Sequence, residues 1–112
     1  MRLYNSSHFE GGAMPKKENE YQGGLIKRIV ERFTGSVVLK NDEQYCQGIP
    51  DLTVLGATGR WAVLEVKRSM DEPLRPNQEY YIEKFGSMGF AAIICPENEA
   101  EVLDEIQRAL GY

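Results

Sequence analysis

Two carboxylates and a lysine stand at the ends of apolar segments, where strands of one sheet would bring them together. Asp51 follows a Gly-Ile-Pro sequence and opens a short apolar segment, while Glu65 and Lys67 close the apolar run 62–67. Because strand side chains alternate between faces, Glu65 and Lys67 share one face. Pro50 restricts the chain in front of Asp51, so the direction in which Asp51 enters its strand is set.

A short turn joins these two segments. Gly56-Ala57-Thr58-Gly59 suits a hairpin, which makes the flanking segments antiparallel neighbours. Counting inward from the turn places Asp51 opposite Val63 or Leu64, within a diagonal of Glu65. The two carboxylates and the lysine therefore converge. Each part alone has a structural interpretation, either a turn that contains an aspartate or a solvated strand end with an ion pair.

Such a trio suits chemistry on phosphates. Carboxylate oxygens are preferred ligands of Mg²⁺, which takes one or two from a protein and completes its shell with water and phosphate. A nearby lysine can orient a water, stabilise charge on a phosphate or, with a lowered pKa, help to deprotonate the nucleophile. The trio indicates metal-assisted phosphodiester hydrolysis. A second hypothesis, from another class, is an accessory module that binds nucleic acid without cleaving it.

Two further polar residues lie on predicted helices. Gln78, Ile82 and Phe85 are spaced four and three apart, so Gln78 shares the buried face of its helix. A buried amide needs a hydrogen-bond partner, which the acidic cluster would offer. Glu20 lies near the start of the first helix, where it suits either the helix dipole or a role at a metal.

Hydrophobic periodicity predicts an α/β fold with the element order α-β-β-β-α-β-α. The Gly23-Gly24 pair in the first helix indicates close approach of another backbone or a frayed first turn. The unbroken apolar run 90–95 is typical of a strand covered on both faces. The first helix has an apolar face of Tyr21, Leu25, Ile26, Ile29, Val30 and Phe33, and the last has Val102, Leu103, Ile106, Ala109 and Leu110. The predicted elements are helix 17–33, strands 36–40, 52–55 and 60–67, helix 76–88, strand 90–95 and a last helix after Pro96.

The ordered combination of these motifs resembles a stand-alone VRR-NUC domain of the PD-(D/E)XK nuclease superfamily. The resemblance covers about residues 16–95 and rests on Gly48-Ile49-Pro50-Asp51, Leu64-Glu65-Val66-Lys67 and Leu74-Arg75-Pro76-Asn77-Gln78, behind a helix that carries Glu20. The chain departs from the family name motif, because Glu65-Val66-Lys67-Arg68 stands where other members carry Val-Arg-Arg. This departure is towards the usual Glu-X-Lys of the superfamily.

The resemblance implies a restriction-endonuclease-like α-β-β-β-α-β core, here with an added C-terminal helix, and a Mg²⁺- or Mn²⁺-dependent deoxyribonuclease. It implies a homodimer acting on branched or Holliday-junction-like DNA, in a phage or bacterial setting. The implied metal ligands are Asp51, Glu65, the main-chain carbonyl of Val66 and Glu20, or Glu18 if the register slips. The implied catalytic residues are Asp51, Glu65, Lys67, Gln78 and Glu20.

The 112 residues suffice for one domain. The net charge of the whole chain, −4, argues against a nucleic-acid partner. All of that charge arises from residues 91–112, which hold five acids and one arginine, whereas residues 14–90 are balanced. The acidic site leads us to expect weak DNA binding by the metal-free protein. Candidate DNA contacts that flank the motifs are Lys16, Lys17, Lys40, Arg68 and Arg75.

The sequence carries few signals for secretion, membrane insertion, zinc binding or disulfide formation. The chain has no secretory signal and no apolar run of membrane-spanning length, so a cytoplasmic location is expected. One histidine, His8, and two cysteines, Cys46 and Cys95, are too few for a Cys/His zinc site or a disulfide framework, and both cysteines are expected to be buried. Residues 1–13 are interpreted as a flexible leader or a cloning remnant, which leaves 14–112 as the nuclease domain.

Overall fold

The computed structural model describes residues 2–3 and 16–112, with side chains from residue 19 onward. Residues 1 and 4–15 lie outside the described part, so the interpretation of a leader stays a prediction. In those described residues, no helix is long and apolar enough to cross a membrane. The elements are β1 (Arg2–Leu3), α1 (Lys16–Arg32), β2 (Val37–Lys40), β3 (Leu52–Leu55), β4 (Trp61–Val66), α2 (Pro76–Met88), β5 (Phe90–Ile94) and α3 (Glu99–Leu110).

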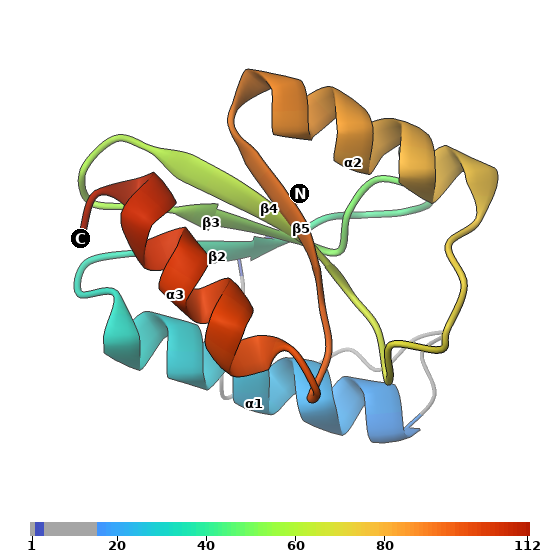
Figure 1. Cartoon of the computed structure of the whole chain (residues 1–112), viewed down its shortest axis with the longest axis horizontal. Coiled ribbons are helices and arrows are strands. Elements are labelled where there is room, and N and C mark those ends of the chain that lie inside the picture. The colour runs from blue at the N-terminus through green and yellow to red at the C-terminus, as the bar shows by residue number, and fades with distance from the viewer. Residues whose placement is uncertain (1, 4–15) are drawn as a thin grey trace.

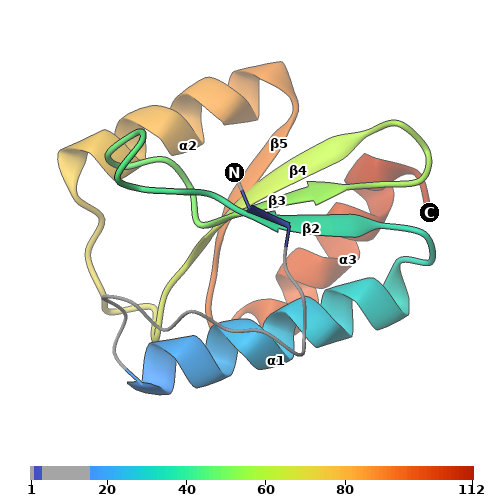
Figure 2. The same cartoon turned by 180° about the vertical axis from the view of Figure 1, so that it is seen from behind.

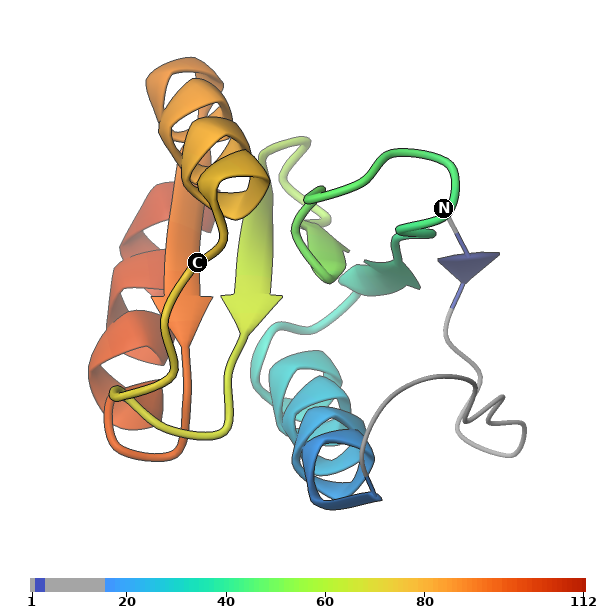
Figure 3. The same cartoon turned by 90° about the vertical axis from the view of Figure 1, so that its right-hand side faces the viewer.

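The strands form one sheet in the order β1-β2-β3-β4-β5, antiparallel except for the parallel pair β4–β5. The predicted α-β-β-β-α-β-α order is confirmed, with the two-residue β1 added at the edge (Figure 1). Helix α2 covers one face of the sheet, and α1 and α3 lie together against the other (Figure 3). The fully buried core lies on the α1–α3 side, where it includes Leu64 and Val66 of β4.

The β3–β4 register differs by one residue from the predicted one. Leu52 pairs with Leu64, so the next position sets Asp51 opposite Glu65. The cause is the turn, in which the Gly56 amide donates to the Arg60 carbonyl at 2.8 Å. The loop therefore holds three residues, with a final glycine in the left-handed region, instead of four. This shift brings the two carboxylates closer together than predicted.

Helix α1 buries a slightly different face from the one predicted. Val30 is 45% exposed, while Gln22 is 1% exposed and belongs to the buried stripe with Leu25 and Ile29. The helix is continuous from Lys16, so the glycine pair marks no frayed turn. A Cβ on Gly24 would lie 2.9 Å from the Arg28 guanidinium, so a side chain of the same helix, instead of another backbone, occupies that space.

Strand β5 is less buried than its apolar sequence indicates. Helices α2 and α3 both contact it, but four of its five residues are only half-buried. The reason is its position, because among the described residues β5 pairs with β4 on one side and with no strand on the other. Ala109 of α3 and Cys46 are also half-buried, against expectation, whereas Cys95 is fully buried, and both cysteines are free.

Candidate active site

Asp51 is fixed by the backbone around it. It lies directly before β3, and its Oδ2 accepts a hydrogen bond from the Val66 amide of β4 at 2.8 Å. The Asp51 carbonyl accepts from the Asn41 amide at 2.9 Å, and the Asn41 side chain donates to the Pro50 carbonyl at 2.7 Å. The carboxylate is therefore held between the ends of β2 and β4, on the sheet face that α2 covers.

Glu65, Lys67 and Gln78 form a buried polar chain beside Asp51. The three residues are 3%, 5% and 4% exposed. Gln78 donates from Nε2 to Glu65 Oε2 at 3.1 Å, and Lys67 donates from Nζ to Gln78 Oε1 at 3.1 Å. Lys67 Nζ also lies 3.8 Å from Glu65 Oε2. The expectation that the Gln78 amide finds its partner in the acidic cluster is confirmed.

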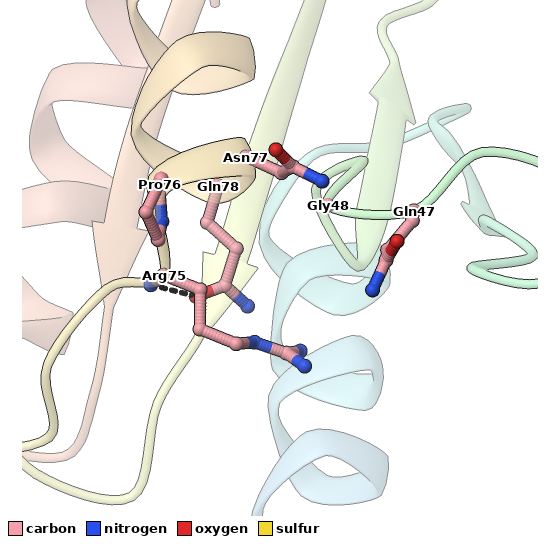
Figure 4. A pocket seen from close by; sticks show the side chains of 6 residues that line it. All are labelled: Gln47, Gly48, Arg75, Pro76, Asn77 and Gln78. Carbon is pink, nitrogen blue, oxygen red and sulfur yellow. Dashed lines mark hydrogen bonds between the residues drawn. The ribbon is translucent and has the colours of Figure 1, made fainter.

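The first turn of α2 places Gln78. Pro76 opens the helix, and the Arg75 amide donates to Gln78 Oε1 at 2.9 Å, as in a capping box. Loop residue Gly48 has φ +88° and packs so closely on the helix that a Cβ there would lie 2.4 Å from the Asn77 Cβ. Loop and helix enclose a pocket of about 220 Å³, lined by Gln47, Gly48, Arg75, Pro76, Asn77 and Gln78 (Figure 4).

Burial gives both carboxyl groups an unusual affinity for protons. Burial raises the pKa of Asp51, against the opposing hydrogen bond from the Val66 amide. Burial and the nearby charge of Asp51 raise the pKa of Glu65 to about 9, although Lys67 opposes this shift. Without a cation the pair therefore retains a proton at neutral pH. A divalent cation would favour the fully ionised pair.

The donor set fits Mg²⁺ or Mn²⁺. The pair supplies two carboxylates, which matches the one or two that Mg²⁺ usually takes from a protein. No group of three His, Cys, Asp or Glu side chains that could hold a metal occurs within the described residues. Glu20 is exposed on α1 and adds no third member, while the side chain of Glu18 lies outside the described part. Val66 adjoins the pair, because its main-chain amide donates a hydrogen bond to Asp51 Oδ2 at 2.8 Å.

Glu72 is a site neighbour that the sequence analysis missed. Its Oε2 lies 3.3 Å from Lys67 Nζ, and its Oε1 accepts from the Arg68 amide and guanidinium, both at 3.2 Å. These hydrogen bonds lower the pKa of Glu72. The i,i+4 spacing from Arg68 was a visible signal, but residues 68–75 have no period that shows the path of the loop.

The candidate DNA contacts divide into two kinds. Arg68 and Arg75 flank the site with largely exposed side chains, each paired with a glutamate, Glu72 or Glu43. Lys40 is half-buried at the end of β2, opposite Leu52. The side chains of Lys16 and Lys17 lie outside the described part.

The α/β fold brings together two carboxylates of the type that Mg²⁺ takes as ligands, and comparison with known proteins gives the class as a nuclease-type domain. Residues 15–97 match the family model described as the VRR-NUC domain. A solved structure described as a VRR_NUC domain is similar, with 26% identity and a TM-score of 0.61 over 80% of this chain and 97% of that one. No curated protein matches the sequence. The chain belongs to the VRR-NUC family.

Proposed function

We propose that this chain is a Mg²⁺- or Mn²⁺-dependent endonuclease that hydrolyses DNA phosphodiester bonds in branched or Holliday-junction-like DNA as a homodimer. The buried chain from Lys67 through Gln78 to Glu65, opposite Asp51, carries this proposal. Membership of a nuclease family supports it independently. The proposed domain spans residues 14–112.

Asp51, Glu65 and the Val66 carbonyl would hold the cation. When bound, such an ion polarises a phosphate oxygen and lowers the pKa of a water. Gln78 keeps both Glu65 and Lys67 oriented, because its amide group donates to Glu65 and its carbonyl oxygen accepts from Lys67. Lys67 Nζ then has donor capacity to orient a water or stabilise a phosphate. Glu20 stays a proposed site residue on the family resemblance.

The pocket at the start of α2 suits a phosphate beside the reacting one. Its lining offers the amides of Gln47 and Asn77 and the Arg75 guanidinium, and contains no carboxylate. Arg75 contacts Glu43 at 2.9 Å, but exposed ion pairs of this kind contribute about 0–1 kcal/mol. A DNA phosphate can therefore replace Glu43. We assign Arg68 and Lys40 to the same strand path.

A cleavage assay tests the proposal. A four-way junction, a flap and a linear duplex are incubated with Mg²⁺, Mn²⁺ or EDTA, and sedimentation gives the oligomeric state. Wild type should cut the branched substrates with metal only. Asp51→Asn should abolish cleavage and retain or tighten DNA binding, because a repelling charge is lost. Asp104→Asn, on α3, is the matched control and should cut like wild type.

Absence of cleavage with either metal would contradict the nuclease proposal and favour a non-cleaving nucleic-acid-binding module. Unfolding of Asp51→Asn would assign that carboxylate a structural role instead. Full activity of a monomer at micromolar concentration would contradict the homodimer.

A further inference from the structure

An aromatic groove of about 500 Å³ lies next to the acidic pair. Loop 41–51 forms one wall and α2 the other; Figure 2 shows this loop beside the helix. Thr53 of β3 and Val63 of β4 form the floor, where they are paired in register. None of its lining residues is a lysine or arginine. The groove is therefore unsuited to a phosphate, in contrast to the pocket at Arg75.

The groove has packed aromatic rings, Trp61 and Phe85, and one exposed ring, Tyr45, at its rim. Trp61 meets Phe85 edge to face at 6.3 Å, and its indole lies so close to Gly89 that a Cβ there would be 2.8 Å from it. Tyr45 is 88% exposed, at the rim. Its turn is closed on Asp42, whose carbonyl accepts from the Tyr45 amide at 3.1 Å. The exposed ring is thus presented by an ordered turn.

The groove is within one nucleotide of the proposed reaction. Thr53 and Val63 lie two residues from Asp51 and Glu65 on the same strands and the same face. A strand rises about 3.3 Å per residue, so the Cα atoms of these floor residues lie about 7 Å from those of the two acids. A base attached to a nucleotide beside the reacting phosphate can reach this distance. Asn41 and Thr53 are hydrogen-bonded to each other at 3.1 Å and Asn41 also donates to the Pro50 carbonyl at 2.7 Å, so this part of the floor is fixed before a ligand enters.

We propose that this groove binds an unpaired nucleobase next to the reacting phosphate, stacked on Tyr45. This inference rests on the proposed function and specifies its substrate as DNA with an unpaired nucleotide at the cut. Aromatic walls suit a base, because every base has a face that stacks. The carboxylate in the lining, Asp42, accepts a hydrogen bond from the Gln44 main-chain amide at 2.9 Å. A base held in a duplex cannot enter, so the groove selects branched or frayed DNA over continuous duplex.

Binding of a fluorescent base tests the groove without requiring cleavage. The full chain carrying Glu65→Gln is titrated in Mg²⁺ with oligonucleotides that hold 2-aminopurine in a single-stranded or a paired position. We expect quenching of the unpaired probe only. Adding Tyr45→Ala should remove the quenching and weaken binding about 5- to 150-fold, since stacking contributes about 1–3 kcal/mol per base. Tyr45→Phe should retain both effects.

Tyr80→Ala is the matched control, because Tyr80 is 59% exposed on α2 and lies outside the groove. Unchanged binding by Tyr45→Ala, or an equal loss in Tyr80→Ala, overturns the proposal. A dimer that dissociates on Tyr45→Ala overturns it too, because the groove would then hold a second copy. Cleavage by wild type is measured separately, so loss of the nuclease proposal and loss of the groove are distinguishable.

Discussion

Gln78 connects the two charged partners of the site through one amide. Its replacement by alanine leaves Glu65 and Lys67 without their shared partner, and buried polar groups left unpaired cost about 1–3 kcal/mol each. We expect Gln78→Ala to fold, with lower stability, and to cleave about 5- to 150-fold more slowly, as about 1–3 kcal/mol implies. Single-turnover cleavage measures the rate. Gln44→Ala, on the exposed loop, should cleave normally, and an unchanged rate for Gln78→Ala would remove Gln78 from the site.

The proton affinity of Glu65 predicts how stability depends on pH. Its pKa rises from an ordinary 4.5 to about 9 in the folded protein, so the folded state binds more protons than the unfolded state between these values. In EDTA the melting temperature should therefore fall as pH rises from 5 to 9. Glu65→Gln should flatten this slope, and Mg²⁺ should raise the melting temperature more at pH 8 than at pH 5. A flat wild-type profile in EDTA would contradict the burial argument.

For the individual site residues, the periodicity of the sequence predicted most of the arrangement. Strand alternation and one hairpin were sufficient to bring Asp51, Glu65 and Lys67 together, and helical spacing turned Gln78 toward them. The register was wrong by one residue because the loop length depends on the left-handed Gly59. Glu72 was missed because an irregular loop carries no period.

Among the elements, the loop before β3 and helix α2 are joined at Gly48. A side chain at Gly48 is unfavourable for two reasons. The φ of +88° is rarely adopted by other residues, and a Cβ would lie 2.4 Å from the Asn77 Cβ. Gly59 has a similar φ of +90°, but nothing lies within 4 Å of a Cβ there. Gly59→Ala therefore measures the cost of the left-handed backbone alone, about 1–2 kcal/mol. We expect Gly48→Ala to be destabilised more than Gly59→Ala in urea unfolding. Only Gly48→Ala should slow cleavage, because it displaces the turn that holds Gln78; equal effects would contradict the close approach.

Glu99 of α3 is one of two carboxylates that connect this helix to α1. Glu99 accepts from Arg28 Nε at 2.6 Å, from Arg28 Nη2 at 2.8 Å and from the Tyr21 hydroxyl at 2.9 Å. The Arg28 hydrogen bond lowers the pKa of Glu99, so its contribution is present above the ordinary carboxyl range and is lost as pH falls through the lowered value. Glu99→Gln should cost about 1 kcal/mol at pH 7.

Thermal unfolding at pH 7 and pH 3 measures this contribution, and the difference between wild type and Glu99→Gln should shrink at the lower pH. Asp104→Asn is the control, because Asp104 pairs with Arg32 at 2.6 Å but is 61% exposed and should lose less. A loss that is independent of pH would contradict an ionic link.

Apart from β1, the existence and order of the elements followed from the sequence, but the degree of burial did not. Val30 and Ile29 are both apolar, and the helix turns only one of them fully inward. The apolar β5 sequence does not reveal that its strand is at an edge, because edge position depends on the sheet order.

For the whole molecule, net charge −4 matters less than where the charges lie. The acids of residues 91–112 belong mostly to α3, on the sheet face opposite α2 (Figure 3). Two of them, Glu99 and Asp104, are already paired with arginines of α1. A DNA strand at the acidic pair would instead meet Arg75, at the start of α2.

Either the net charge of the whole chain or the charges beside the acidic pair could control DNA binding. Two variants with equal and opposite charge changes distinguish these alternatives. Glu101→Gln removes an exposed acid from α3, and Arg75→Gln removes a base beside the site. If the whole-chain sum governs DNA binding, the two affinities shift by similar amounts in opposite directions. If the local face governs, Glu101→Gln binds like wild type, whereas Arg75→Gln binds more weakly and its salt slope falls by about one. Fluorescence anisotropy across a range of NaCl concentrations measures both, and we expect the second outcome because screening weakens exposed charges beyond about 10 Å.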